Sequence, residues 1–208
     1  RVKQPLYVPT GPNQVWSIDF MSDSLADGRR VRLLNIIDDY NRESLAIEVD
    51  TSLPTLRVIR VLERLIVERG CPAAIRCDNG PEFISHLLKQ WCKDESRNIA
   101  IQFIQPGRPM QNAYIERKNG SIRRELLNAY LFTSLAEVRT LSEEWRIDYN
   151  SERPHKSLGY LSPLKYAAQT LCKAALSTPA SGNHLQIEAQ PVVDKAVDAG
   201  NIKFENSN

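Results

Sequence analysis

The sequence predicts an α/β fold in which helices cover the faces of a mixed β-sheet. Three segments rich in valine, isoleucine and leucine come first, at 15–25, 31–37 and 44–49. Helical and strand-like patterns then alternate to about residue 104, which is typical of parallel strands joined by helices. The chain has 208 residues and 42% hydrophobic content, enough for one domain with a sizeable core.

The first three strands form an antiparallel group. Ala26-Asp27-Gly28-Arg29 suits a hairpin turn between the first two. A helix is predicted at 55–69, where Leu56, Ile59 and Leu62 recur at helical spacing and Gly70 ends the run. A short strand follows at 74–77, after Pro72.

The second half is mostly helical. We expect a helix at 85–95, a strand at 99–104, a long helix at 111–131 and another at 134–150. Ser134 and Glu137 have the spacing of a capping box at the start of the last helix. Residues 1–12 are predicted to be an extended lead-in, 13–170 the folded core, and 171–208 a disordered tail with little to bury.

Composition excludes several classes of protein. There is no run of eighteen apolar residues, so no membrane span is expected, and the N-terminus lacks the apolar stretch of a signal peptide. The four cysteines form no C-x-x-C pair, which fits a reduced, cytoplasmic chain. The three histidines form no zinc-ligand set. A net charge of +2 is too small to identify a nucleic-acid partner, so any basic surface must come from local clustering.

Two acids occupy unusual places in the predicted strands. In "VWSIDF", alternation puts Asp19 on one face with Ser17 and Met21, while the large apolar residues take the other face. Asp78 directly follows the strand "AIRC" and begins "DNGPEF". Open α/β sheets bind ligands at the carboxyl ends of their strands. Both acids are therefore candidates for a functional site.

A third acid, Glu116, lies among amides and bases in "GRPMQNAYIERKNGSIRRE". Helical spacing places it on one polar face with Asn112, Asn119, Gly120 and Arg123. Gly120 leaves room for something to approach that face. The opposite face, made of Ile115, Ile122, Leu126 and Ala129, is expected to pack on the sheet.

Each acid also has an ordinary structural explanation. A lone aspartate in a strand is more often an edge residue or a turn former, "DNG" is more often a turn, and a helical glutamate is more often solvated. Asp38 and Asp39, in "IIDDYN", are interpreted as turn formers that can support a nearby site. These patterns alone indicate an α/β domain with three acids that are candidates for a functional site.

Four motifs together are more specific. "VWSIDF", "RCDNGPEF", "FIQPGRPMQNAYIERKNG" and "DYNSERPHKSLGYLSPLKY" resemble, in order and context, the catalytic domain of DDE transposases of the IS-three family of bacterial insertion sequences (OrfB type). The resemblance covers about residues 13–168. It implies an RNase H-like fold with a five-stranded mixed sheet, and a retroviral-integrase-like core in which Asp19, Asp78 and Glu116 are the catalytic and metal-binding triad.

Two departures from the family pattern stand out. The 37 residues between Asp78 and Glu116 slightly exceed the usual gap, and the polar bend "KDESRN" at 93–98 is where an insertion costs least. Lys118 also stands where many members carry an aromatic residue. That second departure concerns DNA contacts rather than the acids.

The resemblance also implies a chemistry that suits the acids. Oxygen-only ligands favour Mg²⁺ or Mn²⁺, and two ions about 4 Å apart can activate the attacking oxygen and stabilise the leaving one in phosphodiester displacement. Water as nucleophile nicks the end of the element, and the freed 3′-OH then joins it to a second DNA position. No covalent enzyme intermediate is required.

The expected partner is double-stranded DNA, both element ends and target. Asn112, Lys118, Asn119 and Arg123 are predicted to hold phosphates, and Arg108 to contact end or target DNA. Arg117 and Arg124 lie off the Glu116 face and suit a solvated surface equally well. His155, in "RPHKSLGY", either contacts DNA or caps the helix that ends near Asn150.

Three functions remain open from the sequence. The first is an active DDE recombinase, acting as a homo-oligomer on DNA at the bacterial nucleoid. The second is an RNase H-type nuclease that cuts without joining, and the third is a domesticated, non-catalytic DNA-binding protein. Family members commonly carry a helix-turn-helix segment before this domain, so the chain is expected either to be a fragment or to act with a separate helix-turn-helix polypeptide.

Overall fold

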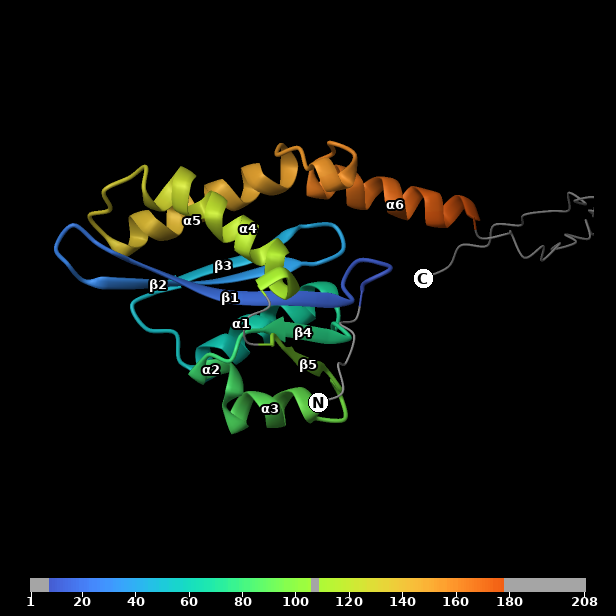
Figure 1. The fold of residues 1–208 in the computed structure, drawn as a ribbon, viewed down its shortest axis with the longest axis horizontal. Helices are drawn as coiled ribbons and strands as arrows, with labels where there is room; N and C mark the ends of the chain where they lie inside the picture. The colour runs from blue at the N-terminus through green and yellow to red at the C-terminus, as the bar shows by residue number, and fades with distance from the viewer. Residues whose placement is uncertain (1–7, 106–108, 178–208) are drawn as a thin grey trace, which may run out of the picture.

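The computed structural model describes residues 8–105 and 109–177. Five strands form one sheet in the order β3-β2-β1-β4-β5 (Figure 1). The strands are β1 (Val15–Ser24), β2 (Arg30–Asp38), β3 (Ser44–Asp50), β4 (Ala74–Cys77) and β5 (Ala100–Phe103). The first three pair antiparallel, whereas β4 pairs parallel with both β1 and β5. The predicted mixed five-stranded sheet is therefore confirmed, and the predicted strand bounds agree to within a residue or so.

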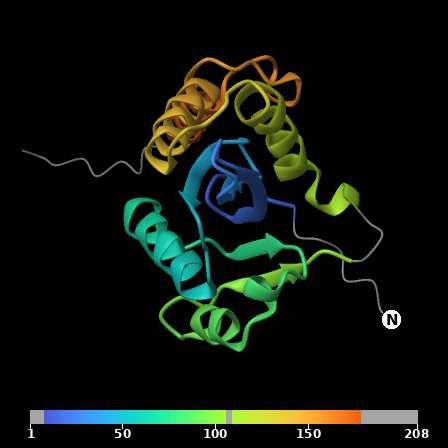
Figure 2. The same ribbon diagram turned by 90° about the vertical axis from the view of Figure 1, so that its left-hand side faces the viewer.

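Helices cover both faces of the sheet. Three of them lie on one side: α1 (Thr55–Arg69), α2 (Pro81–Ile84) and α3 (His86–Lys93). The other side carries α4 (Ala113–Ile122) and α5 (Leu135–Ser151), with α6 (Pro163–Ser177) following α5. Figures 1 and 2 show this separation from two directions. Among the described residues, no helix is long and apolar enough to cross a membrane.

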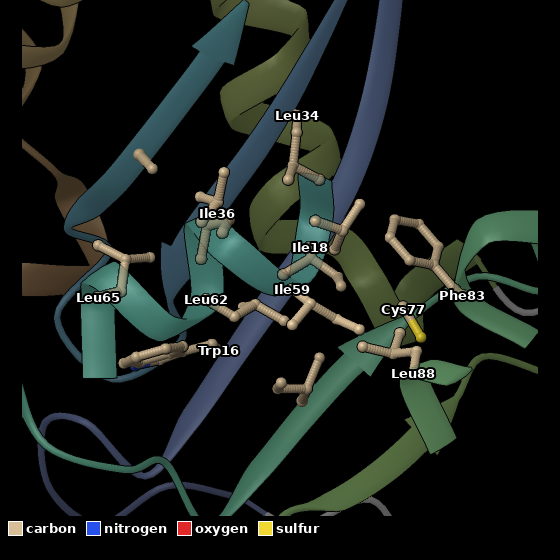
Figure 3. Close-up of a cluster of buried hydrophobic side chains, with 14 of the residues drawn as sticks. Trp16, Ile18, Leu34, Ile36, Ile59, Leu62, Leu65, Cys77, Phe83 and Leu88 are labelled. Atoms are coloured by element: carbon tan, nitrogen blue, oxygen red, sulfur yellow. The ribbon is translucent and has the colours of Figure 1, made fainter. Parts of the chain in front are cut away.

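One hydrophobic core lies between the sheet and α1–α3. Trp16 and Ile18 of β1 and Leu34 and Ile36 of β2 point into it, as strand alternation predicts (Figure 3). Side chains from the helices fill the space opposite, including Ile59, Leu62, Leu65, Phe83 and Leu88. This core fixes β1 beside β4, and those are the two strands that lead to Asp19 and Asp78.

A second core lies on the opposite face. Val31, Leu33 and Val49 of the sheet meet Ile122 and Val138 of the helices above them. Because β1 and β2 line both cores, the two faces are tied together through the central strands. Asp19 and Ser17 share this second face with Met21, as the alternation of β1 predicts.

The predicted long helix at 111–131 is shorter and irregular. A 3₁₀ turn, η1 (Pro109–Asn112), precedes α4, and a π-helical turn, η2 (Arg123–Leu127), follows it. The π turn changes the angular spacing of the residues after Ile122. As a result Leu126 is buried as predicted, but Ala129 is exposed and that prediction is wrong.

Three further differences concern helix ends. The short helix α2 was not predicted, although Pro81 occupies a first-turn position that suits it. Helix α6 continues to Ser177, so the predicted tail cannot begin at 171; residues 178–208 lie outside the described part, as do 1–7 of the lead-in. Ser134 caps α5 as predicted, but the Glu137 carboxylate accepts from the Thr133 N–H rather than from that of Ser134.

Candidate active site

Asp19 lies on β1 beside Asp78, the residue that directly follows the neighbouring parallel strand β4. The β1–β4 register pairs Val15 with Ala74 and Ser17 with Arg76. Continuing that register by two residues places Asp19 opposite Asp78, on the same face of the sheet. Adjacent strands are about 4.8 Å apart, so 58 intervening residues do not prevent the two carboxylates from sharing one site.

Asp19 is partly buried and held by two donors. The Phe20 backbone N–H donates to its Oδ1 at 2.8 Å, and Asn119 Nδ2 donates to its Oδ2 at 2.7 Å. Burial, and to a smaller extent the negative charges of Asp78 and Glu116, together raise the pKa of Asp19 to about 6, against the opposing effect of these hydrogen bonds. The three acids therefore act on one another electrostatically.

Asp78 occupies the turn that follows β4. Its side chain is exposed, and its Oδ1 accepts from the Gly80 N–H at 2.9 Å. A side chain at position 80 would place its Cβ 3.0 Å from that same oxygen, so the glycine leaves space for the carboxylate. Asn79 anchors the turn by donating to the Ile104 carbonyl after β5.

Glu116 reaches the same region from helix α4, which covers the sheet face that carries Asp19. Helix α4 crosses β1 (Figure 1). Its own side chains Ile115 and Ile122 are fully buried. Glu116 faces outward and is exposed, while Asn119, one turn later, bonds directly to Asp19. The structure thus brings together all three acids that the sequence singled out.

The donor set suits a hard divalent cation, although the carboxylates do not surround a metal position in this conformation. Among the described residues, no group of three His, Cys, Asp or Glu side chains is arranged to hold a metal ion. All three acids supply oxygen, the ligand type that Mg²⁺ and Mn²⁺ prefer. Burial, and after it the charges of Asp78 and Glu116, raise the pKa of Asp19, and a bound cation would offset both effects. Both Asp78 and Glu116 are exposed to solvent.

The structure corrects the predicted phosphate contact of Lys118. Its side chain is 1% exposed, and its Nζ donates to the Ile36 carbonyl at 3.2 Å and to the Ala46 carbonyl at 3.4 Å. These carbonyls flank a register shift between β2 and β3, where strand pairing is irregular. Lys118 therefore points into the sheet and pins α4 there. It is two residues from Glu116, about 200° around the helix, so it belongs to the buried side.

The four other predicted DNA contacts each have a different outcome. Asn112 is 4% exposed because it lies in η1, which does not follow the α-helical spacing assumed for the Glu116 face. Asn119 is committed to Asp19. Arg123 is half exposed, and it donates to Asp23 at 3.0 Å and to the Ser22 carbonyl at 2.6 Å. Arg108 lies outside the described residues.

A buried polar network beneath the acids was not predicted from the sequence. Asp39 accepts from Ser17 Oγ at 2.7 Å and pairs with Arg76, which also donates to Gln102 of β5. Ser17 and Arg76 each precede one of the site acids by two residues on the same face. The strand-end position of Asp39 was the available signal, but no pattern in the sequence identifies Arg76 as its partner.

A five-stranded sheet of this order, with one acid on β1, a second directly after β4 and a third on the helix that crosses β1, defines an RNase H-like fold. Two family models, each described as integrase core domain, match residues 9–109 and 97–163 and together span most of the folded part. The chain belongs to the integrase core family.

Curated relatives come from bacterial insertion elements. An uncharacterized protein of insertion element IS407 from Burkholderia multivorans is 44% identical over 183 residues, which is 88% of this chain and 65% of that protein. An uncharacterized protein of insertion element IS476 from Xanthomonas euvesicatoria is 44% identical over 166 residues, which is 80% of this chain and 47% of that protein. The chain thus spans about half to two thirds of these relatives.

Solved structures share the fold at low sequence identity. The integrase catalytic core domain of the virus HTLV-2, in complex with magnesium, superposes with a TM-score of 0.60 at 20% identity, covering 76% of this chain and 98% of that one. A simian T-cell lymphotropic virus intasome, in complex with a PP2A regulatory subunit, gives a TM-score of 0.65 at 17% identity, covering 92% of this chain and 63% of that one.

Proposed function

We propose that this chain is the catalytic domain of an insertion-element transposase that cleaves DNA and joins the freed end to a second site. The observation that carries the proposal is the β1–β4 register, which sets Asp19 beside Asp78 under the helix that bears Glu116. Membership of the integrase core family and the insertion-element origin of the relatives support it.

Asp19, Asp78 and Glu116 are the proposed ligands for two Mg²⁺ or Mn²⁺ ions. Ions bound there supply Lewis-acid activation of the attacking oxygen and charge stabilisation at the leaving oxygen. The magnesium complex of the HTLV-2 integrase core is consistent with this choice of metal.

The chain's own groups orient these acids. The Phe20 N–H and Asn119 hold the Asp19 carboxylate in one position, and the Gly80 N–H does the same for Asp78. Glu116 is exposed, so its side chain can close the site once a cation or a DNA strand is present. None of the three needs to become a covalent nucleophile.

The proposed partners are double-stranded element ends and target DNA, with the protein acting as an oligomer at the bacterial nucleoid. The intasome neighbour supports the oligomeric part by analogy of fold. Arg123 keeps its proposed role beside a phosphate because its guanidinium is half exposed. We also propose that recognition of element ends resides in a helix-turn-helix segment, either elsewhere in the same protein or on a separate polypeptide.

The test is cleavage and strand transfer on oligonucleotide duplexes that carry candidate element ends, in Mg²⁺ and in Mn²⁺. Asp19→Asn, Asp78→Asn and Glu116→Gln should each abolish both reactions while retaining DNA binding. Glu144→Gln, which removes the same charge from an exposed position on α5, is the matched control and should remain active.

Each outcome of that assay is informative. Retention of wild-type cleavage by any of the three variants would remove that residue from the metal site. Cleavage by the unaltered protein without joining would identify an RNase H-type nuclease instead. DNA binding with neither reaction, in both metals, would identify a non-catalytic DNA-binding domain.

A further inference from the structure

A basic cavity lies on the side of α4 away from the three acids. Its volume is about 200 Å³, and it opens between α4 and the "RPHKS" segment that follows α5. Basic side chains line much of it: Arg42, Arg117, Arg153 and Lys156. None of these residues is part of the acidic site, and the sequence motif that contains His155 has no role in the chemistry above.

Two of the guanidinium groups are held in place by aromatic rings. Arg42 lies 3.3 Å above the centroid of the Tyr114 ring. Arg153 lies 5.5 Å from the centroid of Tyr149 and also pairs with Glu125, the acid that opposes the local positive charge. Side chains that are already ordered lose little conformational entropy when a ligand binds, so the cavity is preorganised for an anion.

Three buried nitrogen atoms at this cavity have no hydrogen-bond partner among the described residues. They are Nε of Arg42, Nε of Arg153 and Nε2 of His155. A buried donor without an acceptor is destabilising, so a ligand that brings acceptor oxygens would recover that free energy. Burial first, and then the positive charges of Arg153, Arg42 and Arg117, together lower the pKa of His155 to about 4.

His155 does not act as the helix cap that the sequence allowed. The carbonyl of Asp148, at the end of α5, accepts from the backbone N–H groups of Glu152 and Arg153. The His155 ring instead lies edge-on to Tyr149, with centroids 5.1 Å apart. The structure therefore removes the capping role of His155, and the histidine lines the cavity beside Tyr149.

We infer that this cavity holds a backbone phosphate of a DNA strand whose reacting phosphodiester lies at the three acids. The inference rests on the proposed function and adds a second contact point for the same strand. Tyr114 and Arg117 flank Glu116 in sequence, and a helix with its side chains is about 10–12 Å across. A strand that crosses α4 therefore reaches both places within a few nucleotides.

The first test measures binding of the full chain to a duplex at several salt concentrations, without divalent metal. Arg117→Gln and Arg42→Gln should each weaken binding and flatten the salt dependence by about one unit of slope, because each lost phosphate contact releases one counterion fewer. Arg60→Gln is the matched control: it removes an exposed arginine from α1, on the other side of the sheet, and should leave the slope unchanged.

A second measurement observes the cavity directly. The His155 ring nitrogens can be followed by ¹⁵N NMR, assigned with a His155→Gln variant, during titration with inorganic phosphate and with the duplex. The duplex should shift the His155 resonances and raise the pKa of the ring, because a nearby anion stabilises the imidazolium. Arg117→Gln should reduce that shift.

The outcomes separate this inference from the proposed function. A response to inorganic phosphate but not to duplex would indicate a small-anion site and overturn the assignment to DNA. No response to either, or an equal loss of slope in Arg60→Gln, would overturn it as well. Because the assays contain no divalent metal, an intact cavity response in a protein that fails to cleave would refute the catalytic proposal alone.

Discussion

Lys118 shows how one side chain can take a role opposite to the one its charge suggests. It lies between two polar neighbours in a basic helix, yet it is buried and bonded to two strand carbonyls. Burial lowers the pKa of its ammonium well below the usual value, and the nearby Arg146 adds to the effect. Its function is to position α4, and with it Glu116 and Asn119.

Replacing Lys118 should therefore affect stability rather than salt-dependent binding. Lys118→Ala leaves a cavity and two unpaired carbonyls, so we expect a loss of about 2–5 kcal/mol in the free energy of unfolding. Lys118→Met fills more of the space and should lose less. Urea denaturation measures both, and DNA binding against salt should show unchanged slopes. A flattened slope with full stability would mean that Lys118 reaches DNA.

Asp19 provides a test that depends on pH. Its pKa in the folded protein, about 6, lies above the ordinary value of 3.8, so the folded state favours the protonated acid. Stability should therefore fall as pH rises through this window, by about 2–3 kcal/mol without metal. Asp19→Asn removes that loss. The Oδ1 of Asn119 has no partner among the described residues, so a rotated Asn119 amide can accept from the new side chain at position 19.

Thermal denaturation of both proteins in a metal-free buffer measures this difference. Asp19→Asn should exceed the unaltered protein in melting temperature above pH 6.5 and match it near pH 4. A constant difference across the range would show that Asp19 has an ordinary pKa. Added Mg²⁺ should stabilise only the unaltered protein, since the variant lacks a charged ligand.

At the scale of elements, the pairing of β1 with β4 decides whether a site exists. The Asp39–Arg76 pair lies under that pairing and joins the β2–β3 turn, β1 and β5 through Ser17 and Gln102. Its members are almost fully buried, and burial raises the pKa of Asp39. Such a pair adds little net stability over apolar residues, but breaking it leaves a charge without compensation.

Removing one member of this pair should be much worse than removing both. We expect Arg76→Ala to cost about 3–5 kcal/mol in the free energy of unfolding, and Arg76→Met combined with Asp39→Leu to recover most of that loss. Guanidinium denaturation of the single and double variants tests this. A loss below about 1 kcal/mol for Arg76→Ala would indicate that water compensates Asp39.

At the scale of the whole molecule, two cores share one sheet. Trp16 and Ile18 of β1 face one core, and Leu33 of β2 and Val49 of β3 face the other, so each core packs on one face of the same sheet. The folded unit extends through α6 to Ser177, beyond the boundary at 170 that the sequence indicated. We propose that residues 8–177 suffice for folding.

A chain that ends at Ser177 should retain the stability of the full chain. Residues 178–208 contain few large apolar side chains, and such a segment cannot bury enough surface to stabilise a core. We expect melting temperatures within about 2 °C of each other, which for a domain of this size corresponds to about 0.5–1 kcal/mol at most. A large drop on truncation would show that this segment packs on the domain.

The sequence by itself determined the sheet, most helix positions and the three acids. Alternation in β1 and the turn after β4 are local patterns, and their physical causes, period-two side-chain direction and turn chemistry, act over a few residues. The register of β1 against β4, by contrast, joins residues 59 apart in the chain and depends on how both cores pack. Only the tertiary structure decides it.

The same distinction explains the errors. Helical spacing assumes a regular helix, so it misplaced Asn112 and Ala129, which lie in a 3₁₀ turn and after a π turn. It also cannot tell which charged side chains are buried, because Lys118 and Arg76 become buried through partners that lie 26 to 82 residues away. Local chemistry is encoded in neighbouring residues, whereas desolvation and partner choice arise only when distant segments pack together.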